Sequence, residues 1–462
     1  MNFSADLSLA LPQVILAVSA LGLLVFGAFA PRQTNVLMVA AMAALGVAGI
    51  AAANSPMGRG FSGGLISDSA SAFAQVAIYA ASALAIPLGM KWFERRDVRN
   101  FEFPILILLA ALGMGMMVSA TNLLTLYVGL ELQSLAAYVL ASFMRKDQRS
   151  AEAGLKYFVL GALASGFLLY GMSMLYGATG SLELAAVLKA IASGQVNHQV
   201  LVFGLVFIVA GLAFKIGAVP FHMWIPDVYQ GAPTAITLMI GGAPKLAAFA
   251  MTIRLLVEGL LPLAVDWQQM LMVLAISSLL IGNLAAVAQT NLKRMLAYSS
   301  IAQAGFMLFA ILASNSKSWD SIILYGVAYS VATIGMFAVL VKLKDYTYDG
   351  FNGLAKKEPL LAFAATIFLF SLAGIPLTGG FMAKYYVLLA VVQQGSLLWL
   401  VLFALLMAAV SVYYYFRVIM AMYFKPGEAE LTSPVSSTDK LLLIVTCAIV
   451  ILLGVLPQLV IG

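Results

Sequence analysis

The residues of this 462-residue sequence that could do chemistry are ionisable side chains inside long apolar segments. One is a carboxyl group and four are amines: Glu131, Lys156, Lys215, Lys245 and Lys384. A charge in the middle of a bilayer costs at least ~2.5–3.5 kcal/mol, so such residues usually belong to an ion pathway or to a buried ion pair. Groups at one depth on neighbouring helices can form a lateral chain along which protons move. The pattern therefore predicts proton translocation, with a static ion pair as the alternative.

Depth separates these residues into two classes. At 1.5 Å per residue, Glu131 and Lys215 lie about 14 Å, and Lys245 about 17 Å, from the nearest end of their apolar segments. Lys384 is also far from either end of its segment. The side chains of Lys215, Lys245 and Lys384 are too short for their amines to reach the headgroups. Lys156 lies within about two helical turns of its segment's end. For Lys156, snorkelling to the headgroups and a functional role explain the position equally well.

Two of the lysines lie beside sequences that break helices. Glycine and proline follow Lys215 in Lys215-Ile-Gly-Ala-Val-Pro220, and they precede Lys384 in Gly374-Ile-Pro-Leu-Thr-Gly-Gly-Phe-Met-Ala-Lys384. Irregular backbone at membrane depth lines a cavity or a water path. His222 follows the first break, where it either takes part in proton transfer or satisfies backbone groups that nearby prolines leave free.

The composition places these residues in a membrane protein. Hydrophobic residues make up 63% of the sequence and charged residues 10%, and the mean hydropathy is +1.01. Apolar runs of roughly 20 residues, enough to cross a ~30 Å hydrocarbon layer, recur along the whole chain. We expect an all-α, polytopic membrane protein with about fourteen transmembrane helices. The predicted spans lie near 9–30, 35–53, 69–90, 104–120, 122–144, 152–176, 200–224, 234–257, 268–289, 295–313, 319–341, 360–393, 397–422 and 440–459.

Basic residues decide how these spans are oriented. Seventeen lysines and arginines fall in loops and span ends on one side of the membrane, and four on the other. The four are Arg59, Lys189, Arg254 and Lys317. Because cytoplasmic loops are rich in Lys and Arg, this asymmetry predicts that both termini are periplasmic. Segment 360–393 is long enough for more than one crossing, but a single broken span preserves the asymmetry. Topology then explains the net charge of +6, and no nucleic-acid partner is expected.

The helix breaks fall in predicted spans 7 and 12, which are five spans apart. Two five-helix blocks offset by an odd number of spans have opposite orientations, and matching broken helices in inverted repeats point to a transport site. We therefore expect N-terminal helices over 1–103, inverted repeats over 104–266 and 267–425, and a last helix over 426–462.

The sequence offers no redox centre. Its single cysteine, Cys447, cannot build an iron–sulfur site, and two histidines with different surroundings do not suit a pair of haems. We expect no cofactor or metal bound by this chain, so any redox chemistry takes place in other chains.

Several motifs resemble the antiporter-like membrane subunits of bacterial respiratory complex I. The matching stretches lie at 130–135, 152–158, 211–233, 289–301 and 371–376. The third contains Trp224-Ile-Pro-Asp227, which the whole family shares. Its continuation, Val228-Tyr-Gln-Gly-Ala-Pro233, is the form typical of the subunit N branch.

The resemblance implies roles for the deep residues. Glu131 and Lys215 would be the central carboxylate–lysine pair and Lys245 the connecting lysine. Lys384 would be the terminal lysine of a second half-channel, and His222 would line the broken span.

The resemblance also implies proton translocation driven by electron transfer from NADH to quinone. NADH, FMN, iron–sulfur clusters and quinone would be bound by partner subunits. The expected partners are neighbouring antiporter-like and small membrane subunits and the lipid bilayer, in a bacterial inner membrane. The alternative is a subunit of a multisubunit cation/proton antiporter or of a membrane-bound hydrogenase, which shares the fold and the buried lysines.

Overall fold

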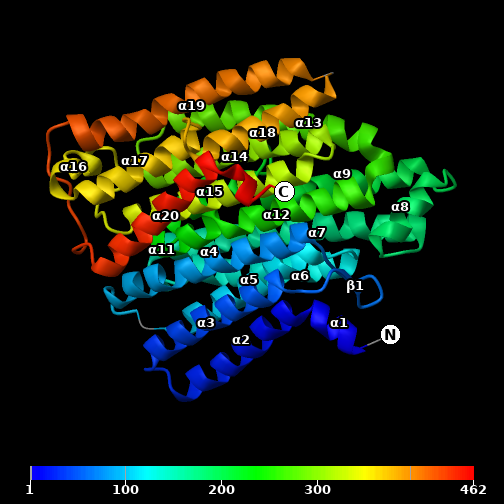
Figure 1. Cartoon of the computed structure of the whole chain (residues 1–462), viewed down its shortest axis with the longest axis horizontal. Helices are drawn as coiled ribbons and strands as arrows, with labels where there is room; N and C mark the ends of the chain where they lie inside the picture. The colour runs from blue at the N-terminus through cyan, green and yellow to red at the C-terminus, as the bar shows by residue number, and fades with distance from the viewer. Residues whose placement is uncertain (1–2, 99, 396, 462) are drawn as a thin grey trace. The chain divides into compact units, whose positions relative to one another are not determined.

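The computed structural model describes residues 3–98, 100–395 and 397–461, and these are mostly helical (Figure 1). The α-helices are α1 (Phe3–Leu9), α2 (Leu11–Phe29), α3 (Thr34–Ala53), α4 (Ser69–Glu94), α5 (Glu102–Ser119), α6 (Leu123–Ala141), α7 (Gln148–Thr179), α8 (Leu184–Ala192), α9 (His198–Ile216), α10 (Trp224–Gly231), α11 (Thr234–Gly241), α12 (Ala243–Ile253), α13 (Ala264–Val287), α14 (Leu292–Ala313), α15 (Ser318–Leu340), α16 (Leu354–Lys357), α17 (Pro359–Ala373), α18 (Gly379–Gln394), α19 (Leu398–Phe424) and α20 (Ser437–Val455). The other elements are the antiparallel strands β1 (Gly58–Gly60) and β2 (Leu65–Ser67), the π-helix η1 (Arg254–Gly259) and the short 3-10 turns η2 (Leu261–Leu263), η3 (Asp349–Phe351) and η4 (Pro457–Leu459).

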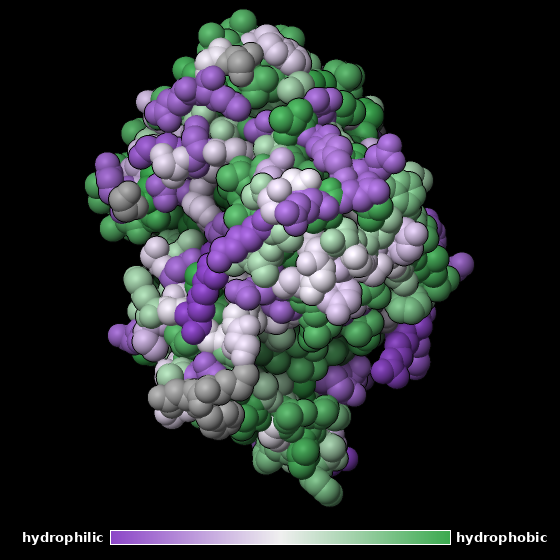
Figure 2. Space-filling view, turned by 90° about the vertical axis from the view of Figure 1, so that its right-hand side faces the viewer, coloured by the Kyte–Doolittle hydropathy of each residue, from purple (hydrophilic) through white to green (hydrophobic). Residues whose placement is uncertain are grey.

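The expected membrane fold is confirmed. Within the described residues, thirteen helical segments are long and apolar enough to cross a membrane. They correspond to thirteen of the fourteen predicted spans, and the span predicted near 360–393 is divided between α17 and α18. Large apolar side chains on several helices are exposed, among them Phe29 at 87% and Leu402 at 70%. Such helix surfaces suit a chain surrounded by lipid. Figure 2 views the helices from one end, where hydrophilic residues lie among hydrophobic ones.

Both predicted helix breaks are present, and a glycine begins each of them. The gap between α9 and α10 starts at Gly217, whose φ is +76°, and the gap between α17 and α18 starts at Gly374, whose φ is +86°. Glycine adopts this left-handed conformation without the steric penalty of a Cβ. The helices therefore end at Ile216, four residues before Pro220, and at Ala373, three residues before Pro376.

A third break separates α11 from α12, where we had predicted one continuous span near 234–257. The backbone of Gly242 is not helical, with φ −99° and ψ −102°, and α12 begins at Ala243. Pro244 has no N–H group with which to continue the hydrogen bonds of α11. Lys245 comes directly after this proline. All three deep lysines therefore lie close to a helix break.

Contacts between residues divide the chain into two compact units. The first comprises Met1–Ile216 and Ala243–Leu271, and the second Gly217–Gly242 and Met272–Gly462. The chain thus passes from one unit to the other at the breaks that follow Lys215 and precede Lys245. Glu131 and these two lysines belong to the first unit, and His222 and Lys384 belong to the second.

Each unit contains a helix that starts in the same way. The sequence Thr-Asn-Leu occurs at 121–123, where α6 begins, and at 290–292, where α14 begins. In both, the asparagine side chain accepts a hydrogen bond from a backbone N–H in the first turn. The leucine N–H donates to a carbonyl far along the chain, that of Leu182 at 2.9 Å in one unit and of Tyr346 at 2.7 Å in the other. An internal repeat would produce this local likeness.

Candidate proton-relay site

Polar side chains from three helices gather around Lys215 and Glu131 in the first unit. The Nζ of Lys215, near the end of α9, donates hydrogen bonds to Oε1 of Gln133 and, at 2.6 Å, to Oγ of Ser134, both on α6. The carboxylate of Glu131, also on α6, accepts a hydrogen bond from Ser165 on α7. The α6 residues therefore face both α7 and α9.

The expected carboxylate–lysine pair is indirect. Among the described residues, Glu131 and Lys215 form no direct ion pair, although the Glu131 carboxylate acts electrostatically on the lysine. Gln133 lies two residues from Glu131 and binds Lys215 through Oε1, while its Nε2 is buried with no hydrogen-bond partner among those residues. A buried donor without a partner lowers the stability of the fold, so its presence calls for an explanation such as a functional role. Gln133 thus joins Lys215 to α6, the helix that carries Glu131, but among the described residues its Nε2 makes no bond to the Glu131 carboxylate.

Lys245 is the third residue of α12 and has 6% of its surface exposed. The N-terminal end of a helix carries a partial positive charge, which makes it an unfavourable place for a permanent cation. A buried amine at this position therefore suits a group that binds and releases a proton better than it suits a structural charge.

Lys384 has a different environment in the second unit. It lies on α18 with 7% of its surface exposed, and its Nζ donates to the carbonyl oxygens of Leu372 at 3.0 Å and Ala373 at 2.8 Å. These carbonyls belong to the last turn of α17, whose partial negative charge stabilises an ammonium. The ring of Phe306 lies 4.9 Å from the same amine. Among the described residues, no carboxylate pairs with Lys384.

A buried hydrogen-bond network extends from the same helix end. The Nε2 of Gln303, on α14, donates to the Leu372 carbonyl at 2.9 Å, so Gln303 and Lys384 share an acceptor. The Nε2 also reaches the hydroxyl of Tyr415 at 3.1 Å, and the hydroxyl of Tyr325 donates to Oε1. Hydroxyl groups donate and accept at once, which is what a chain of proton transfers requires.

The remaining two predicted residues lie at less enclosed positions. The side chain of Lys156 is 43% exposed and pairs with Glu152, one turn towards the start of α7, at 2.7 Å. This geometry fits snorkelling towards the end of the span. His222 lies in the gap between α9 and α10, and its Nδ1 is buried with no hydrogen-bond partner among the described residues.

Gln133, Gln303 and the two tyrosines were not among the predicted residues, because only charged side chains and histidine were considered as relay groups. Glutamines in the middle of apolar spans are the signal that would have found the first two. Among the described residues, no cluster of three or more His, Cys, Asp or Glu side chains could hold a metal ion.

Three basic residues that the sequence analysis assigned to loops or span ends are buried. Lys293 donates to a backbone carbonyl at 2.7 Å, and Lys342 pairs with Asp439. Arg254 binds both carboxylate oxygens of Asp68 at 2.7 Å and also binds a second carboxylate. Each of these cations is held by fixed acceptors near a helix end, which indicates a structural role.

Known proteins resemble this chain over nearly its whole length. The family model described as NADH:quinone oxidoreductase/Mrp antiporter, transmembrane, matches residues 120–412. The NADH-quinone oxidoreductase subunit N of Polaromonas naphthalenivorans (strain CJ2) is 47% identical in an alignment of 471 positions, gaps included. The alignment covers 97% of this chain and 94% of that protein.

Two solved structures share the fold. A chain of respiratory complex I from Thermus thermophilus aligns with a TM-score of 0.83 and 33% identity over 97% of this chain and 98% of its own length. A chain of the membrane-bound sulfane sulfur reductase, an archaeal respiratory membrane complex, aligns with a TM-score of 0.83 and 27% identity. This alignment covers 98% of the present chain and 95% of the reductase chain. More than one kind of respiratory complex uses this fold, so the fold alone does not identify the complex. The sequence identity is higher with the complex I chain, at 33%, than with the sulfane sulfur reductase chain, at 27%.

Proposed function

The chain belongs to the NADH-quinone oxidoreductase subunit N family, and from this premise we propose that it translocates protons through two groups of buried polar residues, one in each unit. As a subunit of this enzyme it works beside other membrane subunits, and the redox cofactors lie in other subunits of the complex. In the first unit the proposed relay comprises Glu131, Lys215 and Lys245. In the second unit it comprises His222 and Lys384.

The observation that carries the proposal is the environment of Lys384. An ammonium at membrane depth is retained either for function or as half of an ion pair. Lys384 is buried and is bound to two backbone carbonyls, with no carboxylate partner among the described residues. The static ion pair that the sequence left open therefore has no support at this position.

The side chains around each relay fit the same proposal. Gln133 connects Lys215 to the helix that bears Glu131, and Gln303 continues the polar path away from Lys384. The free Nδ1 of His222 can accept a proton in the gap that follows Lys215. We propose that Lys156, which is half exposed near the start of α7, exchanges protons with the membrane surface at the entrance to the first relay.

The proposed setting is a bacterial inner membrane with both chain termini in the periplasm. The support is the seventeen-to-four distribution of basic residues and the bacterial origin of the relatives. We further propose that the blocks 104–266 and 267–425 are inverted repeats, for which the matching starts of α6 and α14 are evidence.

Lys384→Arg tests the proposal, because arginine keeps the positive charge but does not release its proton at physiological pH. Proton uptake per NADH oxidised is measured in inverted membrane vesicles, with assembly of the complex checked on native gels. We expect the ratio to fall in an assembled complex.

Lys342→Arg is the matched control, since Lys342 is a buried lysine with a fixed carboxylate partner, Asp439. It should keep the wild-type ratio. A wild-type ratio in Lys384→Arg would show that Lys384 is only a fixed positive charge.

A further inference from the structure

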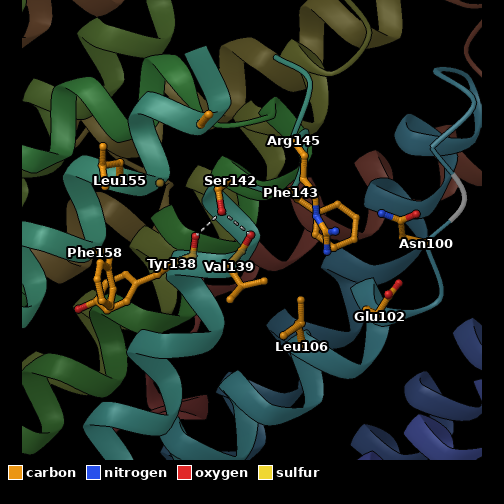
Figure 3. Close-up of a pocket in the computed structure, with 12 residues that line it drawn as sticks. Asn100, Glu102, Leu106, Tyr138, Val139, Ser142, Phe143, Arg145, Leu155 and Phe158 are labelled. Carbon is orange, nitrogen blue, oxygen red and sulfur yellow. Dashed lines mark hydrogen bonds between the residues drawn. The ribbon is translucent and has the colours of Figure 1, made fainter. Parts of the chain in front are cut away.

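A cavity of about 580 Å³ lies within the first unit, at the ends of α5, α6 and α7 (Figure 3). Its volume is within the range of about 300–1,000 Å³ that is typical of small-molecule sites. The proton-relay residues do not line it. It lies where α5 begins, α6 ends and α7 begins, and so at one edge of the membrane-spanning part, on the side predicted to be cytoplasmic.

The lining of this cavity is amphipathic. Asn100, Glu102 and Arg145 lie towards one side in Figure 3, and Leu155 and Phe158 lie on the other. The two apolar residues are on the membrane-spanning part of α7 and are 63% and 48% exposed. An exposed apolar wall at this depth faces the acyl chains of lipids. The cavity therefore joins a polar pocket to the hydrocarbon layer.

The polar side carries charges of both signs. A second cavity of about 600 Å³ shares Asn100, Glu102 and Arg145 with the first and adds Arg96, Asp97 and Lys146 to the lining. Arg96 is stacked on the ring of Trp92 at 3.7 Å. Among the described residues, neither Arg145 nor Glu102 takes part in an ion pair, although both line the same cavity.

We propose that this cavity binds the headgroup of a phospholipid whose only charged groups are a phosphate diester and a primary ammonium, that is, phosphatidylethanolamine. The phosphate diester binds the Arg145 guanidinium, which offers several N–H donors in a planar fork. The ammonium group binds the Glu102 carboxylate and the side-chain oxygen of Asn100. The acyl chains follow Leu155 and Phe158 into the bilayer.

The charge pattern favours this lipid over two others. Phosphatidylcholine carries a trimethylammonium group, which has no N–H to donate to Glu102. Phosphatidylglycerol has no cation to place beside the carboxylate. Of the three, only phosphatidylethanolamine offers both a phosphate for the Arg145 guanidinium and N–H donors of an ammonium for the Glu102 carboxylate.

The test uses the intact complex reconstituted in lipid nanodiscs. Phosphatidylethanolamine, phosphatidylglycerol and phosphatidylcholine, each with the same photoactivatable acyl chain, are added in parallel, and labelled peptides are mapped by mass spectrometry. We expect phosphatidylethanolamine to label peptides containing Leu155 and Phe158 about fivefold more than the other two lipids. Fivefold is the equivalent of ~1 kcal/mol, the upper end of what an exposed pair of opposite charges contributes.

Three variants complete the test, after their assembly is checked on native gels. Glu102→Gln should abolish the preference for phosphatidylethanolamine, because only this lipid offers N–H groups of an ammonium to the carboxylate. Arg145→Gln should lower labelling by all three lipids, because each of them carries the phosphate. Arg149→Gln should change neither result, because Arg149 is exposed at the start of α7 and does not line the cavity. Equal labelling by all three lipids, stronger labelling by phosphatidylglycerol, or labelling of other subunits with none on the peptides that contain Leu155 and Phe158 would each overturn the proposal.

Discussion

Replacing Gln303 by leucine removes the side chain that joins the Lys384 site to the tyrosines. Three hydrogen bonds are lost: from Nε2 to the Leu372 carbonyl, from Nε2 to the Tyr415 hydroxyl, and from the Tyr325 hydroxyl to Oε1. Leucine has a similar size but can make none of them. Lys384 keeps both of its carbonyl acceptors in the variant, so the change interrupts the network without removing the amine.

The expected loss of stability is modest. At about 0.5–1.5 kcal/mol net for each hydrogen bond, the three bonds contribute about 1.5–4.5 kcal/mol. This loss is smaller than the free energy of unfolding of a typical domain, which is about 5–15 kcal/mol. We therefore expect Gln303→Leu to assemble into the complex with a lowered thermal midpoint.

The assay is proton uptake per NADH oxidised in inverted vesicles, together with the rate of NADH oxidation. If the network carries protons to or from Lys384, the ratio falls in the assembled variant. Gln75→Leu is the matched control, because Gln75 is also buried but bonds only to the Gly115 carbonyl, at 3.3 Å, among the described residues. A wild-type ratio in assembled Gln303→Leu would refute a role for this network in proton transfer.

Three other predictions follow from the structure. Lys215→Met should lower the proton ratio more than Lys156→Gln does, because the Lys156 amine is half exposed and paired outside the buried network; equal losses in vesicle assays would contradict this. Burial raises the pKa of Asp68, but its ion pair and hydrogen bonds with Arg254 outweigh burial, so the pKa lies below the ordinary 3.8. The pair therefore contributes stability above about pH 3.9, and this contribution is lost as the pH falls through the lowered pKa. Asp68→Asn should flatten the acid side of a profile of thermal stability against pH. An unchanged profile would show that this pair does not cause the loss of stability in acid. Finally, a tag at the C-terminus should be cleaved by protease added to intact spheroplasts, and protection from the protease would reverse the proposed orientation.

The sequence predicted the membrane spans and two of the three helix breaks for a clear physical reason. Apolar length fixes where the chain can cross, and glycines followed by proline fix where a helix stops. The break at Gly242 had the same signal, in Gly241-Gly242-Ala-Pro244, but it lay inside a run of ordinary length. Length alone gave no reason to divide that run.

The surroundings of the deep lysines were less accessible from sequence. The acceptors of Lys384 are backbone carbonyls, which every residue possesses, so no residue type marks them. The depth of Lys215 was predictable, but its contact with Gln133 depends on how α6 and α9 are rotated against each other. Lys342 was assigned to a loop because a terminal lysine usually reaches water, whereas its burial depends on the packing of Asp439 beside it.

The carbonyl acceptors of Lys384 also affect which mutations the site can tolerate. The contact depends on the backbone oxygen atoms of 372 and 373 and not on their side chains, so other residues that fit the buried space would keep it. Gly374 cannot be replaced in this way: its φ is +86°, and a Cβ there would lie 2.9 Å from Cδ and 3.3 Å from Nζ of Lys384. Keeping the Lys384 amine in this position therefore restricts residue 374, although Gly374 makes no bond to that amine.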